Sequence, residues 1–443
     1  PELRTDSEVP LYRQLYQSMR DSIEMGSFRH GDRVPPTREL AQSLGVNRAT
    51  VAAAYELLEA DGLIRGHVGK GSFVQVPEPK RAAGEAMIRF ETSRPAEGLF
   101  PLEEFRQTAA EVLADAQLGS LLQLGSPAGF APLRRHLLEP GTRDEVLITS
   151  GCQQALDLAQ RVLAPPGSTV LVEDPTYGGL KAVFERQGVR LVGLPVGEHG
   201  VSAEDLRRAI ERERPRLVLL TPNFQNPTGA TLPLESRREI GELITRAGVP
   251  LVEIDIYREL RYEGEPLATV KSLAPEADIL LLGSFSKMAF PGLRTGWMVG
   301  PRSLVARLTE AKQWSDLHSD QLSQAILLRF AESGRLGAHL RRMLEANRRC
   351  LEAAVEACER ELPAGSRFTR PQGGMNLWIT LPEPLDAAAL LPLTQREGVS
   401  YLPGRHFAVE RNADRGLRLS FAGEPPERVR QGIAILGAVA RGE

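Results

Sequence analysis

Leu281-Leu-Gly-Ser-Phe-Ser-Lys-Met-Ala-Phe-Pro-Gly-Leu-Arg-Thr-Gly-Trp297 is the stretch that decides the fold class, because an apolar strand runs there straight into a small-polar turn. Lys287 lies in the turn beside Ser284, Ser286 and a second cation, Arg294. Burial and a nearby cation both favour an uncharged amine, which can condense with an aldehyde. We hypothesise a Schiff base with pyridoxal phosphate, whose phosphate would accept from the two serines and pair with Arg294. An ordinary surface lysine after a buried strand is the alternative.

The composition is that of a multidomain globular protein. The chain has 443 residues, 42% hydrophobic and 25% charged, which is enough for two or three domains. It contains no apolar run near the roughly 18 residues that cross a bilayer, and no apolar leader at the N-terminus. Its three cysteines show neither a pairing pattern nor metal-ligand spacing. We expect a cytoplasmic protein without membrane or metal association.

Residues 77–88 mix proline, glycine and charge between two patterned regions, which predicts a linker. The predicted domains are therefore residues 1–76 and residues 89–443. A linker of about twelve residues spans at most about 40 Å, at ~3.3 Å per residue. The small domain can thus reach a neighbouring subunit but cannot move far.

The small domain has the pattern of helix, turn and helix. Residues 9–25 repeat apolar side chains every four positions, which predicts an amphipathic helix. Pro35 and Pro36 precede a short helix from Thr37, Gly45 turns the chain, and Asn47 is a good N-cap for the next helix. The expected inward residues are Leu11, Leu15, Met19, Ile23, Leu40, Leu44, Val51, Tyr55 and Leu58.

Residues 62–76 hold two short β-rich runs around glycines, which predicts a hairpin with Lys70 at its tip. The start of the second helix of a helix-turn-helix contacts base edges, while flanking cations and amides bind phosphates. The glycine spacing around Lys70 excludes a nucleotide P-loop. The predicted DNA contacts are Arg38, Asn47, Arg48, Thr50, Arg65 and Lys70.

Charge alone does not identify this domain. Residues 1–76 carry nine Lys and Arg against ten Asp and Glu, whereas DNA-binding domains are usually basic. A three-helix protein-binding module is therefore the alternative. Residues 9–76 nevertheless resemble the winged helix-turn-helix of GntR-type bacterial repressors, through the motifs GDRVPPTRELA, GVNRATV, LEADGLI and GKGSFV. The resemblance implies a domain that binds operator DNA as part of a dimer.

Beyond residue 88, helical patterns alternate with short Val/Leu/Ile runs, which predicts an α/β fold with a mostly parallel sheet. Ligands of such sheets bind at the carboxyl ends of strands. The predicted strands are 146–149, 169–172, 217–220, 250–254, 279–282 and 297–299.

Polar motifs follow several of these strands. Gly151, Cys152 and Gln153 open a helix, so their N–H groups can face a phosphate, although a glycine that simply turns the chain is equally compatible. Tyr177 ends another strand and can stack on a flat ring, or else belong to the core. Asn226 lies in a polar turn, where its amide can donate to a phenolate, but Asn-Pro is also ordinary turn chemistry.

Asp255 lies at the end of an otherwise apolar strand and needs a partner, because an unpaired buried carboxylate is costly. A protonated pyridine nitrogen is one such partner, and an arginine is the alternative. Tyr257, expected on the same strand face two residues later, can reach the hydroxyl of the ring.

Five such motifs, in this order, resemble the fold type I pyridoxal phosphate aminotransferases over about residues 88–440. The resemblance implies that Lys287 forms the aldimine, Asp255 pairs with the pyridine nitrogen, and Asn226 and Tyr257 hold the phenolic oxygen. It implies stacking by Tyr177, and binding of a substrate α-carboxylate by Arg418, whose fork suits that group. The implied phosphate contacts are Gly151, Cys152, Gln153, Ser284, Ser286 and Arg294.

Together, the two regions resemble the MocR family of bacterial regulators, which bind DNA through the head and sense the cofactor or an amino compound through the body, commonly as head-to-tail homodimers. Many of these regulators lack the Asn226-Pro-Thr-Gly turn that this chain retains. Ala311-Lys-Gln, Asp316-Leu-His318 and residues 370–378 also resemble 2-aminoadipate and aromatic aminotransferases. The complete winged helix nevertheless favours a ligand-responsive transcription factor. The intact site supports the alternative, an active aminotransferase with a vestigial or secondary DNA-binding head, and no specific feature supports a cofactor-storage protein.

Overall fold

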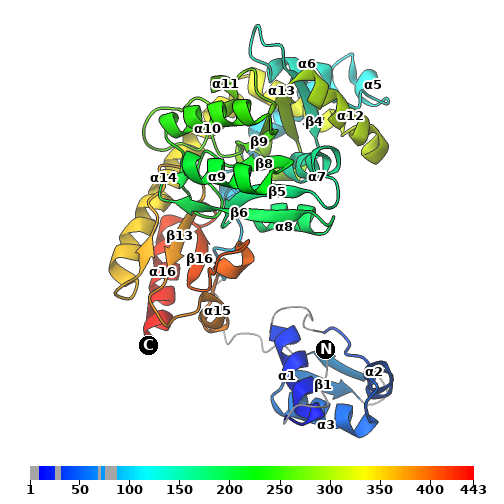
Figure 1. The fold of residues 1–443 in the computed structure, drawn as a ribbon, viewed down its shortest axis with the longest axis vertical. Helices are drawn as coiled ribbons and strands as arrows, with labels where there is room; N and C mark the ends of the chain where they lie inside the picture. Colours follow the sequence, from blue (N-terminus) through cyan, green and yellow to red (C-terminus); the bar gives the residue numbers. More distant parts are fainter. Residues whose placement is uncertain (1–8, 25–30, 68–70, 75–86) are drawn as a thin grey trace. The chain divides into compact units, whose positions relative to one another are not determined.

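The chain divides into two compact units, residues 1–85 and residues 86–443, which we call the head and the body (Figure 1). The computed structural model describes residues 9–24, 31–67, 71–74 and 87–443. Of the linker predicted over residues 77–88, only Met87 and Ile88 lie within this described part.

Within residues 9–24, 31–67 and 71–74, the head has three helices and a two-stranded antiparallel sheet. Its elements are α1 (Leu11–Glu24), α2 (Thr37–Leu44), α3 (Arg48–Ala60), β1 (Ile64–His67) and β2 (Gly71–Val74). Gly45, with φ +65°, ends α2 in the left-handed conformation that glycine adopts without strain. The Asn47 side chain caps α3 by accepting from the Ala49 N–H at 2.9 Å. The predicted helix-turn-helix is confirmed, as is the antiparallel pairing of the two short strands; the predicted tip at Lys70 lies outside the described residues.

One apolar core holds the head together. Leu15, Val51 and Leu58 are fully buried in it, and the partly buried Leu40 and Leu44 pack against it. Tyr55 lies in the same core and donates its hydroxyl to the Pro35 carbonyl at 2.7 Å, and burial raises its pKa to about 12. The α1 face predicted from the four-residue recurrence is thus the face that packs on α3.

The body is built on an eight-stranded sheet of order β4-β11-β10-β9-β8-β5-β6-β7. Its central pairs, from β10 through β6, are parallel, and β11 and β7 pair antiparallel with their neighbours. The strands are β4 (Glu145–Thr149), β5 (Thr169–Asp174), β6 (Arg190–Gly197), β7 (Gly200–Val201), β8 (Leu217–Leu220), β9 (Leu251–Ile254), β10 (Ile279–Ser284) and β11 (Gly296–Gly300). The predicted mostly parallel sheet is confirmed.

Helices cover both faces of this sheet (Figure 1). One face packs on α7 (Gly151–Leu163), α8 (Gly178–Glu185) and α12 (Arg302–Asp316). The other packs on α9 (Ala203–Glu213), α10 (Leu234–Ala247), α6 (Ala131–His136) and α13 (Gln321–Glu332). Three further short or peripheral helices are α4 (Leu102–Leu113), α5 (Leu118–Leu121) and α11 (Val270–Leu273).

A second, smaller sheet has the order β12-β13-β16-β15. It comprises β12 (Arg367–Phe368), β13 (Asn376–Thr380), β15 (Leu402–Pro403) and β16 (Gly416–Ser420), and it packs with α14 (Arg335–Glu361), α15 (Ala387–Arg396) and α16 (Pro426–Arg441). Nearby, β3 (Ile88–Arg89) pairs parallel with β14 (Val399–Ser400). The body thus consists of a large subdomain around the eight-stranded sheet and a small subdomain around the four-stranded sheet.

One local expectation is wrong. Tyr257 does not continue the strand that leads to Asp255, because β9 ends at Ile254 and Tyr257 lies in the turn that follows. The Asp255 N–H donates to the Leu282 carbonyl at 2.9 Å, and the chain leaves the sheet after this bond. Tyr257 is nevertheless buried. No helix in the described ranges has both the length and the apolar composition that a membrane crossing requires.

The head should unfold when its core is opened. Leu58→Ala removes a fully buried side chain at the centre of that core and should cost about 3 kcal/mol of the free energy of unfolding. Thermal unfolding of the full chain, followed by circular dichroism, should show an earlier transition for the head and an unchanged transition for the body. Leu57→Ala, at a partly exposed neighbouring position, is the control. A single transition that moves as a whole in Leu58→Ala would contradict two separate cores.

Candidate functional site

The site in the body is centred on Lys287, which ends a short 3-10 turn, Phe285–Lys287, directly after β10. The Lys287 Nζ donates to the Ser93 carbonyl and lies 5.8 Å from the centre of the Tyr257 ring. The Tyr257 hydroxyl is 3.4 Å from Ser93 Oγ. The structure therefore brings the predicted Lys287 and Tyr257 together over Ser93. No sequence signal pointed to Ser93, which lies in an irregular segment after β3.

Asp255 is 8% exposed, and only one of its oxygens is satisfied. Oδ1 accepts from Asn223 Nδ2 at 2.7 Å, whereas Oδ2 is buried without a hydrogen-bond partner. The guanidinium of Arg258 comes no closer to it than 3.9 Å. Burial raises the pKa of Asp255, although Asn223 opposes the shift. A buried carboxylate oxygen in this state favours a bound group that presents an N–H or a positive charge.

Arg237 and Asn223 support Asp255 from behind. Arg237 is fully buried, and its Nη2 donates to Asn223 Oδ1 at 2.7 Å while its other nitrogens donate to backbone carbonyls. Burial lowers the pKa of this guanidinium. Of the arginines near Asp255, Arg258 approaches Oδ2 only to 3.9 Å, and Arg237 is separated from the carboxylate by the Asn223 amide. Sequence reasoning missed both residues, although Asn223 lies in the same polar turn as Asn226.

Arg418 on β16 is 3% exposed and lies beside Asn226. Its Nη1 donates to Asn226 Oδ1 at 3.0 Å, its Nη2 donates to the Glu91 carbonyl, and its Nε has no hydrogen-bond partner. The ring of Phe407 lies 5.1 Å from its Cζ. Burial lowers the pKa of Arg418, and no ion pair within the described residues compensates it. A buried, incompletely bonded guanidinium suits a carboxylate ligand.

The N-terminus of α7 forms a cradle for an anion. Gly151 has φ +77°, and a Cβ there would lie 2.4 Å from Arg294 Nη2, so only glycine lets this guanidinium lie across the helix start. Arg294 Nη2 donates to the Ser150 carbonyl at 3.4 Å. Helix N–H groups next to a guanidinium are a typical phosphate site.

Two further side chains predicted to bind phosphate border this cradle. Ser284 is buried, and its Oγ accepts from the Ser286 N–H at 3.0 Å. Burial raises the pKa of the Cys152 thiol to about 11, while Ser284, Lys287 and Arg294 oppose the shift. Cys152 is thus a neutral thiol at physiological pH, and it does not repel an anion.

Tyr177 begins α8 and folds over Gly179, where a Cβ would lie 2.5 Å from the ring. Gln153 is exposed, and its Nε2 donates to the Gly179 carbonyl at 3.2 Å, so its side chain supports this turn. Partial burial and the neighbouring Tyr257 raise the pKa of Tyr177, while Arg418 and Arg294 lower it. Tyr177 therefore lies among the other predicted residues, with 43% of its surface exposed.

Glu173 steadies the turn that carries Asn226. It is buried at the end of β5 and accepts from the Thr221 N–H at 3.1 Å and from Gln225 Nε2 at 3.3 Å. Gln225 Oε1 in turn accepts from the Thr228 N–H and Oγ1 at 3.0 and 2.7 Å. Burial raises the pKa of Glu173 to about 8, against these hydrogen bonds. Sequence reasoning did not single out Glu173 or Gln225.

In the head, the structure places most of the predicted DNA contacts on the surface. Asn47 and Arg48 are exposed at the start of α3, and Thr50 is half-buried one turn further. Arg38 on α2 and Arg65 on β1 are also exposed. Lys70 lies outside the described residues. The Asn47 oxygen already serves as the N-cap, so its amide nitrogen is the group left to donate to DNA.

Comparisons with known proteins agree with both halves of this description. Residues 88–436 match the family of class I and II aminotransferases, and residues 11–74 match the gntR family of bacterial regulatory proteins. The chain belongs to the aminotransferase class I and II family. Its gntR-type head makes it a member of the MocR family within that fold.

Three relatives illustrate the relationship. An uncharacterised HTH-type transcriptional regulator, YdfD of Bacillus subtilis, is 30% identical over 100% of this chain and 98% of its own. The probable rhizopine catabolism regulatory protein MocR of Rhizobium meliloti is 28% identical over 98% and 94%. The crystal structure of LysN, an α-aminoadipate aminotransferase of Thermus thermophilus in complex with N-(5'-phosphopyridoxyl)-L-leucine, is 37% identical, with a TM-score of 0.75 over 80% of this chain and 92% of that one.

The residues present fit pyridoxal phosphate. The unpaired Asp255 Oδ2 suits a pyridinium N–H, and the cradle at Gly151 and Arg294 suits a phosphate. Lys287 lies in the turn that follows β10, and β10 pairs in parallel with β9, the strand that leads to Asp255. Across the described residues, no three His, Cys, Asp or Glu side chains group as metal ligands, and the thiols of Cys152, Cys350 and Cys358 are free.

Stability should depend on pH through Glu173. Its folded pKa, about 8, lies above that of an unfolded carboxyl, so its contribution is fully present below roughly pH 4 and is lost as pH rises towards 8. Glu173→Gln keeps the shape but cannot ionise. The melting temperature of the variant relative to the natural chain should therefore rise between pH 5 and pH 8, as measured by circular dichroism. A difference that stays constant with pH would show that Glu173 does not titrate in this way.

Proposed function

We propose that the chain is a pyridoxal phosphate-dependent, ligand-responsive bacterial transcriptional regulator. The head binds operator DNA, and the body binds the cofactor and an amino compound. One observation carries this proposal: the same chain combines two features. Asn47 and Arg48 are exposed at the start of the second helix of the helix-turn-helix, and the body has a buried site around Lys287 and Asp255, one of whose oxygens lacks a hydrogen-bond partner. Because the same chain carries a DNA-binding head, a ligand that binds to the body can control transcription.

In the body, each side chain has a defined task toward the cofactor. Lys287 holds the cofactor covalently through its amine, and Asp255 keeps a proton on the ring nitrogen. Asn226 and Tyr257 hold the phenolic oxygen, and Tyr177 covers the ring. Phosphate binding falls to Gly151, Cys152, Gln153, Ser284, Ser286 and Arg294. The bound cofactor supplies an aldehyde that exchanges amines and a ring that withdraws electrons.

The ligand is an amino compound with a carboxylate. Arg418 supports this proposal, because it is buried, lacks an ion pair within the described residues and has an unbonded Nε. Its hydrogen bond to Asn226 joins the carboxylate subsite to the cofactor subsite. A ligand that fills both subsites can therefore change the packing between β16 of the small subdomain and the turn of the large one.

In the head, Asn47, Arg48 and Thr50 contact base edges, while Arg38, Arg65 and Lys70 contact phosphates. The domains are residues 1–76 and 89–443, joined by the linker 77–88. We also propose a homodimer in which each head reaches the partner's body, a head-to-tail arrangement that a span of about 40 Å permits. Exposed apolar residues in the body, among them Trp314 and Leu317, support association with a second copy.

An aminotransferase of the 2-aminoadipate or aromatic type is the second candidate. Lys287, Asp255, Asn226 and Arg418 are all present in mutually consistent positions, and the LysN structure is similar over most of the body. In that case the Lys287 amine would also serve as the general base and acid that moves the proton. Turnover of an amino donor with a keto acid, abolished by Lys287→Ala, distinguishes this activity from sensing alone.

DNA binding should depend on Arg48. Arg48→Ala removes an exposed cation at the start of α3 and should weaken binding by about 1–3 kcal/mol, which corresponds to roughly 5- to 150-fold. The measurement is a gel shift of the full chain on the DNA that flanks its own gene, at two salt concentrations. Arg13→Ala, at an exposed position on α1, is the matched control and should bind as the natural chain does. No shift by the natural chain under any condition would overturn the regulator proposal.

Cofactor attachment should depend on Lys287. Lys287→Ala should abolish the visible absorbance of the bound cofactor and the added mass on the protein after borohydride reduction, because the variant lacks the amine that forms the bond. Lys181→Ala, which removes a lysine that donates to the Ala408 carbonyl, should keep both signals. A visible band that survives Lys287→Ala unchanged would contradict the assignment of Lys287.

A further inference from the structure

Two residues of the motif shared with working aminotransferases, Lys312 and Asp316, lie outside the contacts described so far. Both are in the last turns of α12. The Lys312 side chain is 0% exposed, and its Nζ donates to Asp316 Oδ1 at 2.8 Å. Burial lowers the pKa of Lys312, while Asp316 opposes the shift. A wholly buried lysine is costly to fold, so its position calls for an explanation.

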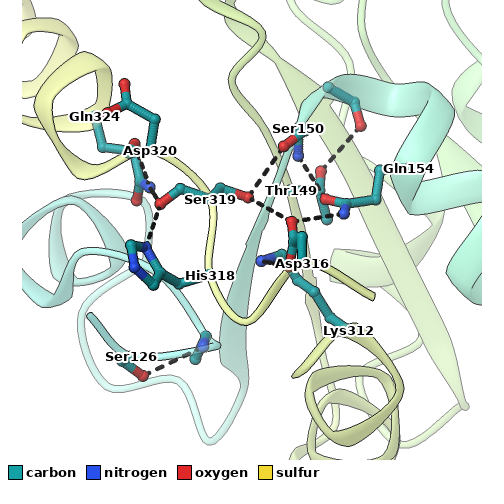
Figure 2. A network of polar contacts seen from close by, with 12 residues as sticks. Ser126, Thr149, Ser150, Gln154, Lys312, Asp316, His318, Ser319, Asp320 and Gln324 are labelled. Carbon is teal, nitrogen blue, oxygen red and sulfur yellow. Dashed lines mark hydrogen bonds and ion pairs between the residues drawn. The ribbon is translucent and has the colours of Figure 1, made fainter. Parts of the chain in front are cut away.

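The second oxygen of Asp316 is linked through Gln154 to Ser150, the residue that precedes the phosphate cradle (Figure 2). Oδ2 accepts from Gln154 Nε2 at 2.8 Å, and Gln154 Oε1 accepts from the Ser150 N–H at 2.7 Å. Ser150 immediately precedes Gly151 at the start of α7 and accepts from Arg294. The chain of contacts Lys312, Asp316, Gln154 thus ends on the residue that positions the cradle.

A second branch holds the same turn from the neighbouring loop. Ser319 Oγ lies 3.2 Å from Ser150 Oγ and 3.5 Å from Asp316 Oδ2 (Figure 2). Gln324 Nε2 donates to the carbonyls of Ser319 and Asp320 at 3.2 and 2.8 Å, which fixes this loop at the start of α13. Ser150 is therefore held by its N–H and its hydroxyl at the same time.

The chemistry of the three side chains suits a phosphate neighbour. A carboxylate alone beside a phosphate site would repel the anion, but the buried ammonium of Lys312 neutralises Asp316. Gln154 accepts from the Ser150 N–H and so fixes the residue before α7. The N–H groups that follow at the start of α7 remain available to the anion. None of the three side chains has to touch the cofactor to act on it.

We propose that Lys312, Asp316 and Gln154 are positioning residues that fix the turn Ser150–Gly151–Cys152 and thereby set the affinity for the cofactor's phosphate, not for its ring. The inference rests on the proposed binding of pyridoxal phosphate. It predicts that disrupting the network weakens a phosphorylated ligand selectively. Pyridoxal, which lacks the phosphate, then serves as an internal reference.

The test compares the two ligands on the cofactor-stripped full chain. Gln154→Met keeps the volume of the side chain but removes both hydrogen bonds. The dissociation constant of pyridoxal phosphate, from visible absorbance or fluorescence quenching, should rise about tenfold, as expected for lost hydrogen bonds near a charged group, while that of pyridoxal stays within about twofold. Asp316→Asn and Lys312→Met should have the same selectivity. Gln160→Met, a buried glutamine at the other end of α7, is the matched control and should change neither constant.

Three outcomes would overturn this inference. Equal weakening of both ligands would indicate a general effect on the site, and unchanged constants would show that the network does not act on the phosphate. If all three variants lose the melting transition of the body, the network supports the fold and is not a positioning device. Failure of the natural chain to bind pyridoxal phosphate is a different result, because it would remove the proposed function itself.

Discussion

The half-paired carboxylate of Asp255 is the constraint on which the body's site depends. A carboxylate that is 8% exposed must be compensated, and the protein hydrogen-bonds only one of its oxygens, through Asn223 and the fully buried Arg237 behind it, while the guanidinium of Arg258 lies 3.9 Å from the other. The parallel strands place the other oxygen at the edge of the sheet where Lys287 also emerges. The remaining compensation is left to a bound group, so the site is arranged for a ligand that carries an N–H or a positive charge.

Short-range patterns in the sequence were enough to predict most of the fold. Helix caps such as Asn47, the four-residue recurrence of α1 and the apolar strand runs are short-range features, and the structure confirms them. Site residues at strand ends, such as Lys287, could be predicted for the same reason, because they directly follow apolar runs. Asn223, Arg237 and Ser93 were not, because their roles arise only from contacts between distant segments. The prediction that Tyr257 continues the strand is wrong, because the chain leaves the sheet after the Asp255 N–H donates to the Leu282 carbonyl. No local sequence pattern shows where this pairing ends.

The head and the body each have buried apolar cores of their own. The head has its own buried apolar cluster, and the body has its cluster around the two sheets. In the body, Arg418 donates directly to Asn226, so the proposed carboxylate and cofactor subsites are joined. We propose that these groups act as a sensor: in a chain with a gntR-type head, cofactor occupancy or amine exchange at Lys287 would shift the equilibrium between states that bind DNA differently.

The most direct measurement of this central claim is the DNA affinity of the full chain, loaded with pyridoxal phosphate and stripped of it, by fluorescence anisotropy at fixed salt on the DNA that flanks its gene. The account predicts an affinity that differs severalfold between the two states of the natural chain, and no difference in Lys287→Ala, which cannot hold the cofactor covalently. Equal affinity of the loaded and stripped natural chain, with DNA binding intact, would contradict it.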